Sequence, residues 1–217
     1  MHLIVRSLGL TEYVAVWQAM RSFTDSRDEL TLDEIWINQH TPVFTQGQSG
    51  RQENILEPRD IPVVHADRGG QVTYHGPGQL VVYLLFDLRR MDLNARRLVD
   101  GIEESIVSVL AGYSIGATTQ RDAPGVYVEA SKIASVGLRI RRGCSYHGLS
   151  LNVAMDLEPF DRINPCGHVN LQMSQVKDFG GPTDLSLVTK DLVSVLSHQF
   201  RFTSLIHTKG IGDSLVA

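Results

Sequence analysis

The thiol of Cys166 is the side chain in this sequence whose neighbours most favour chemistry. Cys166 lies between Pro165 and Gly167, which is typical of a rigid exposed turn, whereas structural cysteines are usually buried among apolar residues and inert. Asn164 and His168 place polar groups on both sides of that turn. Only the thiolate is a nucleophile, and a free thiol with a pKa of about 8.5 needs a nearby cation to ionise at neutral pH. We therefore interpret Cys166 as a candidate nucleophile.

The candidate cations for this thiol are Lys132 and His168. Lys132 opens an apolar strand of small residues, so it is either an ordinary exposed strand end or a cation placed at a pocket. The other thiol of the chain, Cys144, has Arg141 and Arg142 beside it, and these cations could also ionise it. A hairpin turn such as the one at Cys144 usually lies at the end of a sheet, away from a pocket. Cys144 is therefore the weaker candidate.

A glycine-rich segment, residues 68–78 with the sequence RGGQVTYHGPG, surrounds a short strand. Glycine allows tight turns and lets a ligand approach backbone N–H groups. The segment is therefore either a strand that lines a substrate site or an ordinary pair of β-turns. It is neither a phosphate-binding loop nor a dinucleotide fingerprint, because no helix follows it and no Gly-Lys-Ser/Thr is present.

The composition is that of a globular protein. The 217 residues are 42% hydrophobic and 20% charged, which allows a core without disulfides. The net charge of −4 argues against bulk nucleic-acid binding, although Arg139, Arg141 and Arg142 form a basic cluster that is either solvated or a dock for an acidic protein. The sequence shows no export signal, no membrane-length apolar run and no zinc-ligand spacing. We expect a cytoplasmic protein with free thiols, no metal, no nucleic-acid partner and no membrane association.

Apolar periodicity predicts the elements that must position these groups. Helices are expected over residues 11–23, 95–113 and 185–200. Strands are expected at residues 35–37, 63–65, 71–74, 80–88, 126–128, 133–140 and 145–153, the last two forming a hairpin. Strands in the middle with helices flanking them singly predict an α/β (α+β) fold, in which helices flank a largely antiparallel mixed sheet. We expect one catalytic domain over residues 1–217 and a mobile tail after His207.

Four blocks, taken together and in this order, resemble the lipoyl(octanoyl) transferases. They are RGGQVTYHGPGQ at residues 68–79, KIASVGLR at 132–139, HGLSLN at 147–152 and INPCG at 163–167. The resemblance extends from about Trp36 to Leu196, and no chemical position departs from the family pattern. Four ordered blocks are far more specific than any single glycine turn.

This resemblance implies a biotin/lipoate protein ligase-type fold with a transferase core at about residues 30–205. It implies transfer of octanoyl from the phosphopantetheine of acyl carrier protein to a lysine of lipoyl domains, as in 2-oxoacid dehydrogenase complexes and glycine cleavage H protein. The aligned Cys166 would be the thioester nucleophile and the aligned Lys132 its activator, with no ATP or metal cofactor. We expect a monomer. The implied substrate-binding residues are Arg68, Gly69, Gly70, Gln71, Val72, Thr73, Tyr74, His75, Ser135, Val136, Gly137, Gly148, Leu149 and Ser150.

Three other functions fit parts of the pattern. An ATP-dependent lipoate or biotin ligase could use the same fold, but it activates its acid as an adenylate and needs no nucleophilic cysteine. A non-catalytic module could hold a carrier or an acyl chain without forming a covalent adduct. A cysteine hydrolase would need a histidine partner, for which His168 is the candidate.

Overall fold

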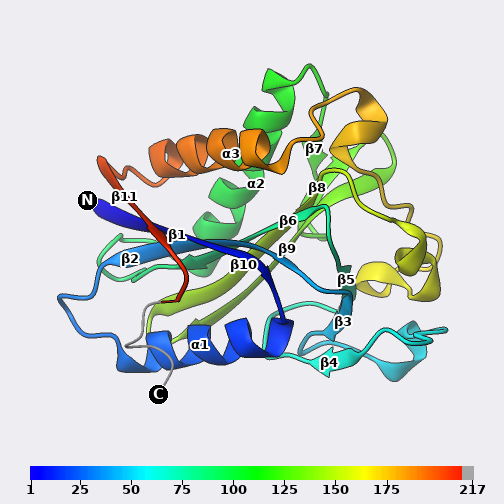
Figure 1. Ribbon diagram of the computed structural model, residues 1–217, viewed down its shortest axis with the longest axis horizontal. Helices are drawn as coiled ribbons and strands as arrows, with labels where there is room; N and C mark the ends of the chain where they lie inside the picture. The colour runs from blue at the N-terminus through cyan, green and yellow to red at the C-terminus, as the bar shows by residue number, and fades with distance from the viewer. Residues whose placement is uncertain (212–217) are drawn as a thin grey trace.

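An eight-stranded sheet forms the centre of the protein in the computed structural model, which describes residues 1–211 (Figure 1). Its strands are ordered β11-β1-β2-β6-β10-β9-β8-β7. Their bounds are β1 (His2–Thr11), β2 (Asp33–His40), β6 (Gln79–Leu85), β7 (Thr118–Thr119), β8 (Gly125–Val128), β9 (Ser131–Arg141), β10 (Cys144–Asn152) and β11 (Ser204–Lys209). Only β1 pairs in parallel, with β2 and β11, so the predicted largely antiparallel mixed sheet is confirmed.

Helices cover both faces of this sheet. Helix α1 (Tyr13–Ser26) packs on one face, while α2 (Ala95–Gly112) and α3 (Leu185–Gln199) pack on the other (Figure 1). A smaller sheet with the order β4-β3-β5 is formed by β3 (Val43–Gln46), β4 (Val63–His65) and β5 (Val72–His75). Among residues 1–211 we find no helix that combines the length and the apolar character needed to cross a membrane.

Local sequence explains where these helices begin. The Asn94 side chain caps α2 by accepting from Arg97 N at 2.9 Å, and Asp184 caps α3 by accepting from Ser186 N at 2.8 Å. Helix α1 begins two residues later than predicted, because Thr11 still pairs with His40 in the β1–β2 ladder. The apolar stripe of each helix then lies on the sheet, as the 3.6-residue period requires.

Four strands were not predicted: β1, β3, β7 and β11. Strand β1 alternates buried and exposed residues only as far as Val5, and a register shift near Gly9 interrupts the pattern. Strand β11 is an edge strand whose Leu205 and Ile206 are exposed, so burial leaves no alternation to read in its sequence. The predicted mobile tail begins within β11, which is an ordered strand, and its last part, residues 212–217, lies outside the described residues.

Candidate active site

Lys132 and Cys166, 34 positions apart in the chain, are in contact in the structure. The Lys132 ammonium donates to Cys166 Sγ at 3.1 Å and to the backbone carbonyl of Pro124 at 2.8 Å. Lys132 is 1% exposed, and its Nζ lies 5.2 Å from the centroid of the Tyr127 ring. The partners of this buried cation are thus a carbonyl oxygen, an aromatic face and a sulfur. Of these, the sulfur is the group that can take up a negative charge.

A short backbone pairing brings these two residues together. Lys132 N donates to Gln172 O at 2.8 Å, and Ser174 N donates to Lys132 O at 3.0 Å. The Ser131 hydroxyl reinforces the pairing by donating to Ser174 Oγ at 2.9 Å. The segment that follows Cys166 therefore extends the start of β9 as a parallel bridge, which holds the thiol loop beside the lysine.

The thiol is presented by a strained turn. Cys166 has φ 57°, in the left-handed region that non-glycine residues rarely adopt, and Gly167 follows with φ 76°. Gly167 N donates to Asn164 O at 3.0 Å, which closes the turn, and Asn164 N is anchored to Asn54 O at 2.8 Å. A Cβ at Gly167 would come within 3.2 Å of the Gln71 side chain. The turn is thus fixed by its surroundings, as a nucleophile held in one geometry requires.

A cavity of about 480 Å³ opens beside Lys132 and Cys166. Its walls contain the predicted substrate-binding residues apart from Tyr74, together with His147 and His168. Those predicted lining residues are Arg68, Gly69, Gly70, Gln71, Val72, Thr73, His75, Ser135, Val136, Gly137, Gly148, Leu149 and Ser150. Motifs from β5, β9, β10 and the thiol loop, distant in sequence, therefore converge on one space.

Tyr74 lies outside this cavity. Its ring packs against Phe44 and Phe160, with ring centroids 5.5 Å away in both cases. Tyr74 packs in the core of the small sheet, whereas Val72, Thr73 and His75 of the same strand border the cavity.

Arg68 fixes the loop over the cavity. Its buried guanidinium donates to Thr45 O at 2.5 Å, Gln71 O at 2.8 Å and Gly69 O at 2.9 Å. Burial lowers the pKa of Arg68. The predicted substrate contact is therefore also a clamp that keeps both glycines of the loop in place. A Cβ at Gly137 would lie 3.1 Å from Gly69 O, which explains the small residue there.

Two buried histidines, His75 and His147, border the cavity, and His40 packs behind His75 with ring centroids 5.8 Å apart. Burial lowers the pKa of His75 to about 3 and that of His40 to about 4, so both are neutral near pH 7. His75 Nδ1 pairs with Gln79 Oε1 at 2.7 Å, and His40 Nε2 pairs with the Tyr83 hydroxyl at 2.6 Å. His147 pairs with Asp67 through Nε2 at 2.9 Å. These histidines therefore add no charge to their part of the cavity near pH 7.

Sequence reasoning missed several residues of the site. Tyr13 and Tyr83 line the cavity, and Asp67 orients His147 from outside it. Tyr13 and Tyr83 lie in apolar helix and strand patterns that suggest only core packing, and Asp67 lies just before the glycine-rich segment without belonging to it. The backbone oxygen of Pro124 accepts a hydrogen bond from the Lys132 ammonium, and no sequence pattern indicates a backbone contact of this kind.

The competing thiol lies elsewhere. Cys144 is buried, and burial raises the pKa of its thiol, which disfavours the nucleophilic form. Of the basic cluster, Arg139 lines the cavity, while Arg141 forms an ion pair with Asp25 at 2.9 Å. Only part of that cluster therefore faces the candidate site.

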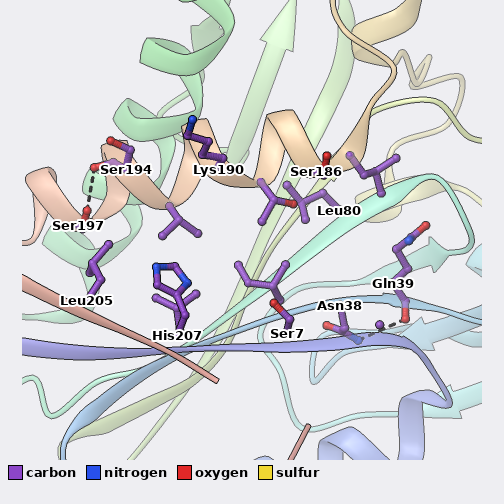
Figure 2. Close-up of a pocket in the computed structure, with 16 residues that line it drawn as sticks. Ser7, Asn38, Gln39, Leu80, Ser186, Lys190, Ser194, Ser197, Leu205 and His207 are labelled. Atoms are coloured by element: carbon purple, nitrogen blue, oxygen red, sulfur yellow. Dashed lines mark hydrogen bonds between the residues drawn. The ribbon is translucent and has the colours of Figure 1, made fainter. Parts of the chain in front are cut away.

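A second cavity of about 550 Å³ lies between α3 and the strands β1, β2 and β11 (Figure 2). Leu80 lines it, whereas Val81 and Tyr83 on the opposite face of β6 line the first cavity. The Lys190 side chain points away from the strands, while His207 reaches toward α3 (Figure 2). Neither Lys132 nor Cys166 borders this space, so it is separate from the candidate active site.

The chain belongs to the family of lipoyl protein ligase A/B catalytic domains, whose pattern matches residues 12–201. Two similar relatives are proteins named octanoyltransferase. That of Shewanella piezotolerans is 55% identical over 97% of this chain and 96% of its own length. That of Shewanella halifaxensis is 55% identical with the same coverage of both chains.

Solved structures share the fold at low sequence identity. A putative lipoate protein ligase from T. acidophilum, determined with bound lipoic acid, aligns with a TM-score of 0.80 at 15% identity, over 99% of this chain and 93% of that one. The biotin protein ligase of Aquifex aeolicus aligns with a TM-score of 0.55 at 11% identity, over 92% of this chain and 69% of that one. The expected biotin/lipoate protein ligase fold is thereby confirmed.

Proposed function

We propose that this protein transfers an octanoyl group from octanoyl-acyl carrier protein to a lysine of a lipoyl domain, through a thioester on Cys166. The observation that carries the proposal is the 3.1 Å contact between Lys132 Nζ and Cys166 Sγ inside the cavity. The octanoyltransferase relatives at 55% identity over nearly the whole chain support the acyl group and the reaction type.

In the first half-reaction the Cys166 thiolate attacks the carbonyl of the carrier's thioester. An opposite charge in contact with the sulfur favours its ionised form. The tetrahedral intermediate collapses with expulsion of the phosphopantetheine thiolate, which takes up a proton. The acyl group remains on Cys166, and Lys132, whose ammonium gives that proton to the leaving thiolate, is left as a neutral amine that can accept a proton in the next step.

In the second half-reaction the neutral amine of the acceptor lysine attacks the Cys166 thioester. A C–N bond forms, the C–S bond breaks, and the amine proton is lost as the thiolate returns beside Lys132. Lys132 is the nearest group to relay that proton. A thioester is already activated toward an amine, so the proposal needs neither ATP nor a metal.

The cavity suits an acyl chain. Val72, Val136 and Leu149 supply apolar walls, and the buried histidines beside them are neutral near pH 7. Burial contributes about 0.8 kcal/mol per methylene, so an eight-carbon chain could gain roughly 5 kcal/mol on entering.

A transfer assay tests the proposal. Purified protein, octanoyl-acyl carrier protein and an apo lipoyl domain are combined without ATP, and the domain is followed by mass spectrometry. The wild type and the matched Cys144→Ala control should both add one octanoyl group to the domain, whereas Cys166→Ala should not. Transfer that requires ATP and free octanoate would instead indicate a ligase.

A further inference from the structure

A single peptide group lies between two buried, oppositely charged side chains near the thiol. The N–H of Gly125 donates to Glu103 Oε1 at 2.6 Å. The C=O of Pro124, on the same peptide bond, accepts from the Lys132 ammonium at 2.8 Å. In a trans peptide these two groups point in opposite directions, so the carboxylate and the ammonium lie on opposite sides of one rigid plane.

Glu103 is a carboxylate at a position where packing alone would favour an apolar side chain. It lies on the face of α2 that packs against the sheet, and it is 4% exposed. Within residues 1–211 no cation comes within ion-pair distance of Glu103. Arg96, on the same helix, pairs with Asp100 at 2.9 Å instead. Burial raises the pKa of Glu103, and the Gly125 amide and the charges of Arg96 and Lys132 oppose that rise. Among residues 1–211, the Gly125 amide is the one hydrogen-bond partner of this buried carboxylate. Burial of a carboxylate with so few partners is costly, which indicates that Glu103 has a functional role.

Gly125 brings the ammonium directly against this peptide. Its φ of 134° is disfavoured for residues with a side chain. A Cβ there would lie 2.5 Å from Lys132 Cε, 3.0 Å from Lys132 Nζ and 2.5 Å from Ala134 O. The lysine side chain thus occupies the space that any larger residue would take.

We propose that Glu103 is a positioning residue that holds the Lys132 ammonium against Cys166 Sγ through the peptide group joining Pro124 and Gly125. This inference rests on the proposed role of Lys132 and Cys166. A carboxylate on the N–H fixes the plane of the peptide and polarises its C=O, which strengthens the bond to the ammonium. With one proton held by Pro124 O, another is directed at the sulfur.

The sign of the effect separates this role from a simple charge effect. Through space, the negative charge of Glu103 disfavours a thiolate, so its removal would speed alkylation of Cys166. Loss of positioning acts in the opposite direction, because the ammonium is no longer held beside the sulfur. A merely structural role would lower the melting temperature without moving the pH profile of the thiol.

The test follows alkylation of Cys166 by iodoacetamide from pH 5 to pH 10, in a Cys144→Ala background with a single thiol. Glu103→Ala and Glu103→Asp should slow alkylation at pH 7 by about two- to fourfold and move the profile to higher pH, because neither reaches Gly125 N. Glu103→Gln keeps an acceptor oxygen and should retain most of the wild-type rate. The exposed neighbour Glu104, changed to Ala, is the matched control and should leave the profile unchanged.

In a Lys132→Met background, Glu103→Ala should not slow alkylation of Cys166 any further, because Glu103 acts through the lysine. Faster alkylation in Glu103→Ala, an unchanged profile in folded Glu103→Asp, or an equal effect with and without Lys132 would each overturn the proposal. Alkylation involves no acyl donor. A failure to transfer octanoyl would therefore contradict the proposed function without changing the result of this measurement.

Discussion

Replacing Lys132 by methionine removes the ammonium from the sulfur while keeping a side chain of similar volume. Lys132 is buried, so a shape-preserving substitution limits the loss of packing. The structure places a single charged hydrogen-bond donor 3.1 Å from Cys166 Sγ, and such bonds are worth about 1.5–3 kcal/mol. At about 1.4 kcal/mol per factor of ten, the equilibrium constant for ionisation of the thiol should fall roughly ten- to 150-fold.

The alkylation rate should fall by less than the thiolate population. A more basic thiolate is also a better nucleophile, with a Brønsted coefficient of about 0.4–0.5. The two effects together predict alkylation by iodoacetamide about four- to fifteenfold slower at pH values where both thiols are mostly protonated, with a smaller difference at about pH 7. Above about pH 10, where both thiols are ionised, the variant should be the faster of the two. The comparison measures the rate of Cys166 alkylation against pH for each variant in a Cys144→Ala background. Circular dichroism checks that each variant is folded.

Equal rates for the folded Lys132→Met variant and its Lys132 parent at pH 7 would refute the reasoning. A uniform drop at every pH would also contradict it, because it would indicate lost access to the sulfur rather than lost ionisation.

Two further predictions concern the surroundings of the site. Gly125→Ala should destabilise the protein by about 1–3 kcal/mol in urea unfolding and slow alkylation toward the Lys132→Met value, because the added Cβ would meet Lys132 Cε at 2.5 Å. The control is Gly112→Ala, where no heavy atom lies within 4 Å of the added Cβ. Equal stability of the two variants would contradict the packing argument. Burial lowers the pKa of His75 to about 3, below its unfolded value of about 6.5, so the unfolded chain binds the proton first as the pH falls, and His75 alone should reduce the free energy of unfolding by about 2 kcal/mol from pH 7 to pH 5. His75→Gln should flatten that dependence in urea titrations at the two pH values, and an unchanged slope would show that His75 is not the titrating group.

The helices and the central hairpin could be predicted because their patterns are local. The period of Leu98, Ile102 and Ile106 defines the buried face of α2 without reference to the rest of the chain. The turn at Arg142 and Gly143, both with positive φ, joins β9 and β10 as a tight hairpin should. Strands β1 and β11 could not be predicted in this way, since their pairing depends on segments about 200 residues apart.

The candidate site shows the same division. Cysteine, lysine and glycine motifs mark their own positions in the sequence, and the structure places those motifs around one cavity. The groups that hold Lys132 leave no such mark. Pro124 contributes only a carbonyl, and Glu103 reads in sequence as an ordinary helical acid beside exposed Glu104. Their relation to the ammonium exists only once α2 packs beside β8 and β9.

The most direct test of the account is to trap the covalent intermediate. The protein is incubated with octanoyl-acyl carrier protein in the absence of any lipoyl domain, and its intact mass and its peptides are then measured. The account predicts one octanoyl group, lost on treatment with hydroxylamine and located on the peptide that contains Cys166. An octanoyl group on Cys144, or octanoyl transfer by Cys166→Ala at the wild-type rate, would contradict it.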